Sequence, residues 1–167
     1  MHMIYMGNTM LKGFPHIIGD QPRILILGSM PSVQSLKQNE YYAHPTNRFW
    51  RILSSLYQVN FHTYEDKVQF LKANNIALWD VVDCCERDGS LDTNIKKVIL
   101  NPIDSLLEQY SSIQMIYCNG RKAYELLRKN FPNLLTRTIL LPSTSSANQS
   151  KNYQEILKEW SIIHDDK

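Results

Sequence analysis

The stretch RILILGS, residues 23–29, is almost continuously apolar until it ends in a glycine and a serine. Three further runs have the same character: IALWDVV at 76–82, QMIYCNG at 114–120 and TILLPS at 138–143. Continuous rather than alternating apolar residues indicate strands that are covered on both faces, as in parallel sheets. We therefore predict a central parallel sheet of about four strands.

Segments with a helical spacing of apolar residues separate these runs. We expect helices at 46–58, 67–74, 101–110, 121–130 and 152–163. Thr46 is expected to cap the first of them, and Asn101 followed by Pro102 is typical of a helix start. Helices between parallel strands cover both faces of the sheet, so we predict an α/β protein with three layers, an α/β/α sandwich.

Length and composition are those of an ordinary globular protein. The 167 residues, of which 43% are hydrophobic, predict one soluble domain over 1–167, with 1–13 as a loosely ordered lead-in. No run approaches the about 20 apolar residues that span a bilayer, and no signal-peptide pattern is evident. The formal net charge of +2 permits a polyanionic partner without requiring one.

The three cysteines, Cys84, Cys85 and Cys118, indicate reduced thiols in a cytoplasmic protein, because their number is odd and no secretory signal is evident. Neither a CxxC motif nor a suitably spaced Cys/His set is present, so we expect no metal site. We expect Cys84 and Cys85 to pack in the interior, because no group that would stabilise a thiolate is evident.

The ends of the predicted strands are the expected site of function. They run into polar segments at 28–35, 83–92, 119–120 and 142–148, and parallel sheets bind ligands beyond the carboxyl ends of their strands. We therefore expect these segments to converge on one rim. The first contains GSMPS at 28–32, which lacks the ending of a phosphate-binding loop and the GxSxG of an α/β-hydrolase.

A second cluster of functional residue types lies at 41–50, YYAHPTNRFW. Its two tyrosines precede the expected helix, where packing in a core explains large aromatic residues less easily. Asn47 and Arg48 are expected in the first helical turn, whose backbone amides form an anion site. His44 precedes Pro45 and could equally be a surface turn residue.

Five segments carry a resemblance to a known family: GSMPS (28–32), YYAHPTNRFW (41–50), ALWDVVDCCERDGSLD (77–92), the NG at 119–120 within CNGRKA, and LPSTSSAN (141–148). They resemble the uracil-DNA glycosylase superfamily, and within it most closely the hypoxanthine-DNA glycosylase branch, also called DNA-deoxyinosine glycosylase. The resemblance runs from about Phe14 to the C-terminal helix. HPTNRFW is also similar to the mismatch-specific uracil branch, so the more specific combination is GSMPS with YYAHP and RDGSLD.

The resemblance implies a uracil-DNA glycosylase-like fold and an enzyme of base-excision repair. Such enzymes flip a damaged nucleotide out of the duplex and hydrolyse its N-glycosidic bond, which leaves an abasic site. It also implies DNA with a deaminated base as the partner, no metal or organic cofactor, no membrane, no obligate protein partner and a monomer. The matching motifs contain no lysine nucleophile, so we expect a monofunctional glycosylase without lyase chemistry.

The water-activating position differs from the family pattern. Most branches carry Asp or Asn before the proline of the first motif, where this chain has Met30, whose thioether can neither orient water strongly nor take a proton. We hypothesise that Asn47, which matches the Asn of the HPxNxFW motif, is catalytic and holds the water through its carbonyl oxygen. Ser29 and Ser32 are weaker candidates, and Asn47 could instead only tie the loop to the helix start.

Two residues match positions that bind the flipped base. Tyr42 matches the aromatic residue that stacks on the base in the mismatch-specific branch. Asp80 matches the base-reading Asn of uracil-specific enzymes, and a carboxylate could accept the N1–H of hypoxanthine, which adenine lacks. Asp80 could equally cap the next turn. The expected substrate-binding set is Gly28, Met30, Pro31, Ser32, Tyr42, His44 and Asp80.

The segment LPSTSSAN matches the second superfamily motif, a loop that enters the minor groove. Leu141 stands where some uracil-specific branches use a His to stabilise the departing base, which argues against efficient uracil excision. Without the first motif, an ordinary Ser/Thr-rich loop would explain the segment. Asp92 is expected to cap the turn that follows it. The expected DNA-contacting set is Arg48, Arg87, Ser143, Thr144, Ser145 and Asn148.

Two other functions stay open from the sequence alone. One is a uracil- or mismatch-specific DNA glycosylase, which the relative excision of uracil and hypoxanthine would distinguish. The other is a catalytically silent nucleic-acid-binding module with the same fold, which Met30 keeps open. Tight binding without formation of abasic sites would favour the silent module.

Overall fold

Residues 10–165 are described by a computed structural model of the chain. Their main sheet contains β2 (Ile24–Gly28), β3 (Ile76–Asp80), β6 (Met115–Asn119) and β7 (Thr138–Leu141). All neighbouring strands are parallel, in the order β3-β2-β6-β7. The prediction of a parallel sheet built from four apolar runs is therefore confirmed.

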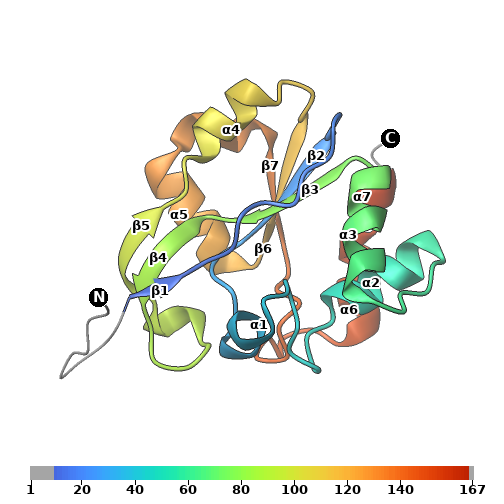
Figure 1. The fold of residues 1–167 in the computed structure, drawn as a ribbon, viewed down its shortest axis with the longest axis horizontal. Helices are drawn as coiled ribbons and strands as arrows, with labels where there is room; N and C mark the ends of the chain where they lie inside the picture. Colours follow the sequence, from blue (N-terminus) through green and yellow to red (C-terminus); the bar gives the residue numbers. More distant parts are fainter. Residues whose placement is uncertain (1–9, 166–167) are drawn as a thin grey trace.

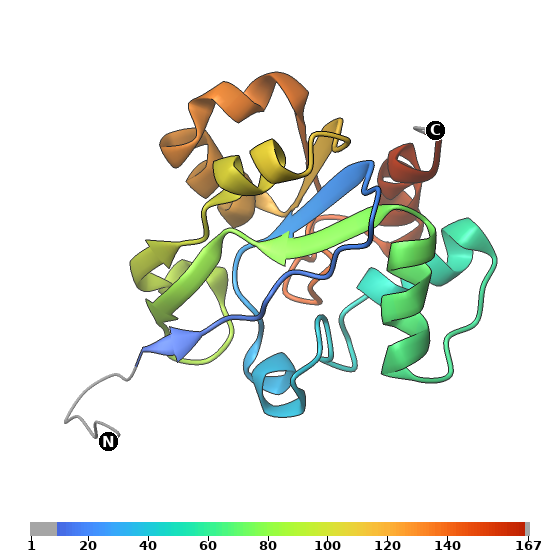
Figure 2. The ribbon, with the colours of Figure 1, turned by 45° about the horizontal axis from the view of Figure 1, so that its top comes forward.

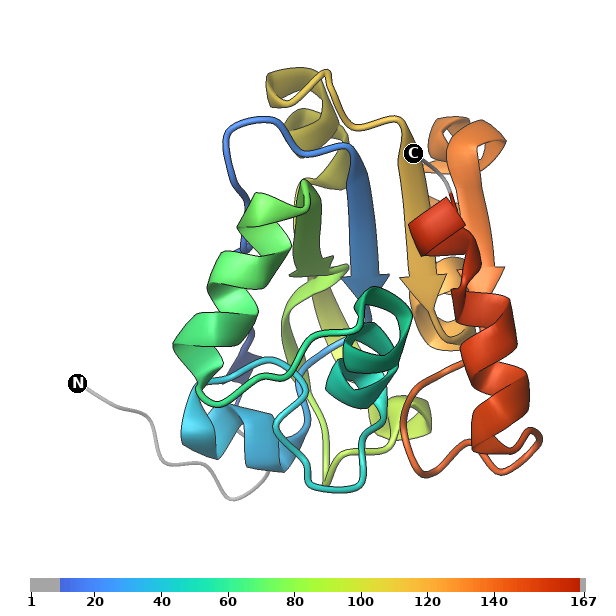
Figure 3. The same cartoon turned by 90° about the vertical axis from the view of Figure 1, so that its right-hand side faces the viewer.

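The register of the main sheet places the carboxyl ends of its strands at one edge. Gly28 of β2 lies beside Asp80 of β3, and Asn119 of β6 lies beside Leu141 of β7. Figure 3 shows these strands pointing toward the same end of the molecule, where several of the connecting loops gather. Polar side chains at the strand ends are thereby brought together although they are far apart in sequence.

Helices cover both faces of this sheet, as Figures 1 and 2 show. In β2, Ile24 and Ile26 belong to one apolar core and Leu25 and Leu27 to another, because successive side chains of a strand point to opposite faces. The predicted three-layer α/β/α sandwich is therefore confirmed. The first core is covered by α2 (Phe49–Tyr57), α3 (Tyr64–Ala73), α6 (Tyr153–Trp160) and α7 (Ile162–Asp165), and the second by α4 (Ile103–Gln109) and α5 (Arg121–Asn130).

A second, antiparallel sheet lies beside the sandwich. It consists of β1 (Leu11–Lys12), β4 (Val82–Glu86) and β5 (Lys96–Leu100), in the order β1-β4-β5. The prediction of a loop-like segment from residue 83 is therefore wrong for 83–86. Because β4 is only partly buried, polar residues are interspersed along it and the continuous apolar signal is missing.

The start of the described chain is more ordered than expected. β1 pairs with β4, and the N–H of Gly13 donates to the carbonyl of Asp83 at 2.7 Å. The predicted loose lead-in over 1–13 is therefore wrong for 11–13, because this stretch forms an edge strand of the second sheet. The rest of that lead-in, 1–9, lies outside the described residues.

Helix boundaries differ from the predictions mainly in the first turns. α2 begins three residues after Thr46, so Asn47 and Arg48 precede the helix instead of forming its first turn. α4 begins just after Pro102, which is its N-cap, and α3 begins earlier than predicted, behind a capping box at Thr63. α5 has the predicted bounds, and the last predicted helix is divided into α6 and α7.

Three short helical segments complete the described fold: α1 (Val33–Gln38), η1 (Asp92–Asn94) and η2 (Pro132–Arg137). α1 and η1 belong to the connections that follow β2 and β4, so both lie near the carboxyl edge of the main sheet. Within residues 10–165, no helix is long and apolar enough to cross a membrane.

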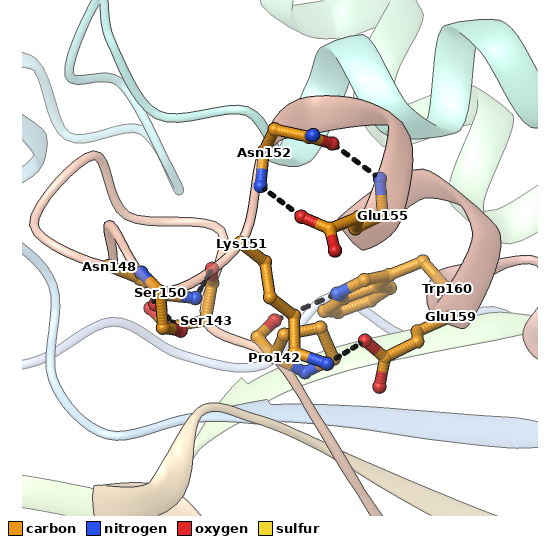
Figure 4. A network of polar contacts seen from close by, with 9 residues as sticks. All are labelled: Pro142, Ser143, Asn148, Ser150, Lys151, Asn152, Glu155, Glu159 and Trp160. Carbon is orange, nitrogen blue, oxygen red and sulfur yellow. Dashed lines mark hydrogen bonds and ion pairs between the residues drawn. The ribbon is translucent and has the colours of Figure 1, made fainter.

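Figure 4 shows how α6 anchors the loop that follows β7. Asn152 and Glu155 form a capping box, in which each side chain accepts a hydrogen bond from the other residue's N–H, at 2.9 and 2.8 Å. The indole N–H of Trp160 donates to the carbonyl of Pro142 at 2.9 Å. The loop is therefore fixed to α6 at both of its ends, which positions it beside the sheet edge.

Candidate active site

A cleft of about 720 Å³ opens at the carboxyl edge of the main sheet. The predicted convergence of the strand-end segments on one rim is confirmed, except that only the end of 83–92 reaches the cleft. The second sequence cluster, YYAHPTNRFW, contributes to the same wall. The lining residues come from 28–35, 41–47, 90–93 and 143–149, together with Asp80 and Asn119.

The floor of the cleft is formed where Asp80 and Tyr42 meet over Gly28. A Cβ atom on residue 28 would lie 2.5 Å from Oδ1 of Asp80 and 2.8 Å from the hydroxyl oxygen of Tyr42. Oδ2 of Asp80 and the Tyr42 hydroxyl are buried and have no hydrogen-bond partner among the described residues. Buried polar groups are normally paired, so the floor presents two groups that a polar ligand would satisfy.

Burial dominates the electrostatics of Asp80. The side chain is 3% exposed, and its removal from water raises the pKa of the carboxyl from 3.8 to about 7. The nearby Asp92 contributes to this rise and the Arg87 guanidinium partly offsets it, so the value of about 7 is the net of the three effects. The alternative that Asp80 caps the next turn does not hold, because the N–H groups of Val81 and Val82 donate to the carbonyls of Gly28 and Ser29.

Tyr42 has an unusual backbone conformation, with a φ of 54° that a bulky residue rarely adopts. Its ring stacks on Phe49, with centroids 4.1 Å apart and planes 26° from parallel. The flanking N–H groups of Tyr41 and Ala43 donate to the side chains of Tyr64 and Ser35, which hold the turn. Burial raises the pKa of Tyr42, more than the nearby Asn119 lowers it, so the hydroxyl stays neutral.

Asn47 is fixed by two hydrogen bonds to its side-chain oxygen. Oδ1 accepts from the N–H of Phe49 at 2.9 Å and from the hydroxyl of Thr144 at 2.8 Å. Because a backbone N–H can only donate, the atom that faces it is the oxygen, and the NH₂ group is the free end. Both lone pairs of Oδ1 are therefore already used. Asn47 cannot bind the catalytic water through this oxygen, contrary to the expectation from the sequence.

A chain of contacts extends this arrangement into the sheet. Thr144 accepts a hydrogen bond from Nδ2 of Asn119 at 3.0 Å, and its own N–H donates to Oδ1 of Asn119 at 3.0 Å. Asn119 ends β6, so Asn47 is connected through Thr144 to the rigid edge of the main sheet. The amide of Asn47 is thereby held in one orientation at the cleft wall.

Ser29 and Asp92 form a second polar pair in the cleft. The hydroxyl of Ser29 donates to Oδ1 of Asp92 at 2.6 Å. The expectation that the Asp92 side chain caps the turn that follows it is therefore wrong, because this side chain instead reaches across to Ser29. Burial raises the pKa of the Asp92 carboxyl, against the hydrogen bond from Ser29 and the charges of Arg87 and Lys122. The cleft thus contains a second carboxyl besides Asp80.

Met30 packs mainly away from these polar groups. It is 7% exposed and belongs to a third apolar cluster with Val82, Cys85 and Ile95. Its sulfur would lie 3.7 Å from a Cβ on Gly13, on the side of the second sheet. Met30 borders the cleft, where the sequence predicted it to bind substrate. Its thioether, however, packs in the apolar cluster.

The family model of the uracil DNA glycosylase superfamily matches residues 15–163. The chain belongs to this superfamily. A "Hypoxanthine DNA glycosylase" of Methanosarcina acetivorans is 38% identical over 158 residues, covering 91% of this chain and 96% of the relative. A protein of the same name from Methanosarcina barkeri is 36% identical over 143 residues, covering 83% of this chain and 88% of the relative.

A solved structure is also similar to this chain. It is a solution NMR structure from Methanosarcina acetivorans, described there as a candidate uracil DNA glycosylase. The two chains are 36% identical with a TM-score of 0.80, and the match covers 93% of this chain and 96% of the other. The uracil DNA glycosylase-like fold expected from the sequence is therefore confirmed.

Arg87 of this chain is buried, whereas the sequence predicted an exposed position on the rim of the cleft. It is 7% exposed, and its guanidinium donates to the carbonyls of Gly89 and Pro31, each at 2.6 Å. The predicted contact between Arg87 and DNA is therefore wrong for this conformation. The charge instead lies near Asp80 and Asp92 and lowers the pKa of both carboxyls.

The loop 143–149 is shaped by residues that were expected to bind DNA. Arg48 donates to the carbonyls of Thr144, Ser145 and Asn148, at 3.3, 2.7 and 3.1 Å, which leaves it inside the loop rather than on its surface. Thr144 is 1% exposed, so its predicted DNA contact is wrong. Ser143, Ser145 and Asn148 are half-buried and line the cleft, and their contact with DNA stays a prediction.

Other predicted substrate-binding residues also lie at the cleft. Ser32 caps α1 by accepting from the N–H of Ser35, and the carbonyl of Pro31 holds Arg87. His44 is exposed, and its Nδ1 is 2.9 Å from the hydroxyl oxygen of Thr46. All three border the cleft, and their contact with substrate stays a prediction.

Sequence reasoning missed the cleft roles of Asn119 and Asp92. Both lie in segments that the sequence had placed on the rim, but their side-chain partners are distant in the chain. Among the described residues, no group of three or more His, Cys, Asp or Glu side chains could hold a metal ion.

Replacing Asp80 by Asn should stabilise the protein more at about pH 8 than at about pH 5. The folded protein holds the Asp80 proton more tightly than the unfolded chain does, so the wild type loses stability as pH rises from 3.8 to about 7. An Asn side chain cannot ionise and avoids this loss. Urea unfolding at both pH values measures the difference, with Asp20→Asn at an exposed site as control. Equal stabilisation at both pH values would contradict the buried-carboxyl assignment.

Proposed function

We propose that this chain is a monofunctional DNA glycosylase that hydrolyses the N-glycosidic bond of hypoxanthine in deoxyinosine and leaves an abasic site. The observation that carries the proposal is the Asp80 carboxyl at the floor of the cleft, whose Oδ2 is buried without a hydrogen-bond partner among the described residues. The names of the two Methanosarcina relatives, which match most of the chain, support the same substrate.

Recognition of the base would depend on its Watson–Crick edge. The N1–H group of hypoxanthine can donate a hydrogen bond to the ionised Asp80 carboxylate, whereas N1 of adenine carries no proton and cannot donate. The neutral Tyr42 hydroxyl beside Asp80 supplies a further hydrogen-bonding group at the same edge. The Tyr42 ring is backed by Phe49 on one face, so its other face is the one on which a flipped base would stack. Such stacking contributes about 1–3 kcal/mol per base.

Hydrolysis requires a placed water and an acceptor for its proton. We assign the placement to the NH₂ group of Asn47, which donates to the water oxygen. As the bond between the sugar C1′ and the base nitrogen breaks, its electron pair leaves with the base. The water oxygen then bonds to C1′, and the carboxylate of Asp92, held by Ser29, takes the water proton. Asp92 thus supplies the proton acceptor that Met30 cannot provide.

Contact with the duplex is assigned to the loop 143–149. Its serine hydroxyls and backbone face the cleft mouth, while Arg48 fixes its shape from within. The partner is DNA that contains a deaminated base. We further propose that the protein acts as a monomer in the cytoplasm, where its three cysteines, all free of disulfides, would stay reduced.

Uracil excision is the alternative within the superfamily. Two features favour hypoxanthine over it: Asp80 stands where uracil-specific enzymes read the base with Asn, and Leu141 stands where some of them stabilise the departing base with His. Leu141 is buried and belongs to the core, so it offers no polar group to a leaving uracil.

Matched duplexes that carry one deoxyinosine or one deoxyuridine test the substrate and Asn47 together. Strand breaks after alkali should dominate for deoxyinosine, and Asn47→Ala and Asn47→Asp should each lower the single-turnover rate by about 10²-fold or more. Asn47→Asp is the sharper variant, because it keeps the oxygen that accepts from Phe49 and Thr144 and replaces the amide donor with a carboxylate oxygen, which can only accept.

Each outcome of that assay separates the candidate functions. Breaks mainly at deoxyuridine would assign the chain to the uracil-excising enzymes. Binding without breaks at either base would favour the silent module. Normal rates for both folded Asn47 variants would remove Asn47 from the catalytic site while leaving the substrate assignment intact.

Asp80→Asn should reduce discrimination between deoxyinosine and deoxyadenosine sites. An Asn side chain can donate to the unprotonated N1 of adenine as well as accept from N1–H, so the variant loses the acceptor-only property of the carboxylate. Excision rates from the two duplexes, compared with those of the wild type, measure the ratio. An unchanged ratio would assign base recognition to other groups.

Asp92→Asn should lower turnover by about 10²-fold, because the amide keeps an acceptor for the Ser29 hydroxyl but takes no proton. The wild-type rate should rise with pH as the Asp92 carboxyl ionises, and this dependence should flatten in the variant. Asp88→Asn, at an exposed position in the same connection, is the control. A variant with normal rate and normal pH profile would exclude Asp92 as the proton acceptor.

A further inference from the structure

Leu91 is a large apolar side chain left in water at the mouth of the cleft. It is 54% exposed and lines the cleft next to Asp92. The other exposed large apolar side chains of the described chain, Met10, Val33, Ile99 and Ile162, do not line it. An exposed leucine alone is ordinary, but one at the entrance to a candidate active site needs a reason.

The connection that carries Leu91 is braced on several sides. Buried Arg87 donates to the carbonyl of Gly89, and the Ser90 hydroxyl accepts from the N–H of Val33 at the start of α1. On the other side of Leu91, the Asp92 side chain accepts from Ser29. The leucine is therefore presented by a fixed backbone, which lowers the entropy lost when its side chain inserts into a partner.

The loop 143–149, which lines the same cleft, offers no comparable side chain. Residues 143–149 read STSSANQ, so none of them has a large apolar group that could replace a base in a stack. Removal of a nucleotide from a duplex leaves a gap between its neighbours, and proteins that unstack DNA commonly fill such gaps with Leu, Ile, Phe or Met. Figure 1 shows that this loop and the β4–β5 connection lie at the same end of the molecule.

We propose that Leu91 enters the base stack of double-stranded DNA and fills the gap left by the flipped nucleotide. The inference rests on the proposed glycosylase function, which requires extrusion of the base. It assigns the gap-filling side chain to the β4–β5 connection, and not to the loop 143–149, which the resemblance identifies as the loop that enters the minor groove; both segments line the cleft. Val33, whose N–H donates to the side chain of Ser90 next to Leu91 in the sequence, is a second exposed apolar residue near this connection.

The test compares Leu91→Ala with Ile99→Ala, because both residues are 54% exposed but Ile99 lies on β5 and does not line the cleft. Single-turnover excision from a deoxyinosine duplex should fall about tenfold or more in Leu91→Ala and stay unchanged in Ile99→Ala. Leu91→Met should restore most of the rate. A 2-aminopurine next to the deoxyinosine should show a smaller fluorescence rise with Leu91→Ala, because fewer nucleotides stay extruded.

The outcomes separate this inference from the function on which it rests. No excision by the wild type would overturn the glycosylase function, and the role of Leu91 with it. Wild-type excision with an equal rate in Leu91→Ala would overturn the role of Leu91 alone. An equal loss in Ile99→Ala would also overturn it, because the effect would then reflect general apolar surface rather than the cleft mouth.

Discussion

Asp80 and Tyr42 share the floor of the cleft because residue 28 has no side chain. Gly28 ends β2 in register with Asp80, and any Cβ there would occupy the space of both polar groups. The left-handed backbone of Tyr42 and its stacking on Phe49 direct the hydroxyl to the same point. Unpaired buried groups cost stability in the empty protein, and a ligand that pairs them recovers this free energy on binding.

The charges around this floor suit a reaction in which charge separates. Two carboxyls, Asp80 and Asp92, lie near one guanidinium, that of Arg87, in a region largely shielded from water. An excess of negative charge stabilises positive charge that develops on the sugar as the glycosidic bond breaks. It does not help the departing base, so a hydroxyl donor such as that of Tyr42 is the group suited to that side.

The sequence was sufficient for the main sheet and for the location of the cleft, because buried parallel strands have a strong apolar signal and their ends share an edge. It was insufficient for β4, a partly exposed strand whose polar residues resemble those of a loop. Among site residues, it failed for Arg87 and Thr144. Both are polar types that usually face water, and their burial depends on partners far away in the chain, such as Pro31 and Asn119.

Thr144 donates to Asn47 and is paired twice with Asn119, so three segments of the chain share one set of hydrogen bonds. Loss of the Thr144 hydroxyl would remove one of the two hydrogen bonds to Oδ1 of Asn47 and would also remove the acceptor for Nδ2 of Asn119. Effects of substitutions at these positions are therefore expected to be non-additive. During divergence, a change at one of the three is tolerated only with compensating changes at the others, so these positions should covary among related sequences.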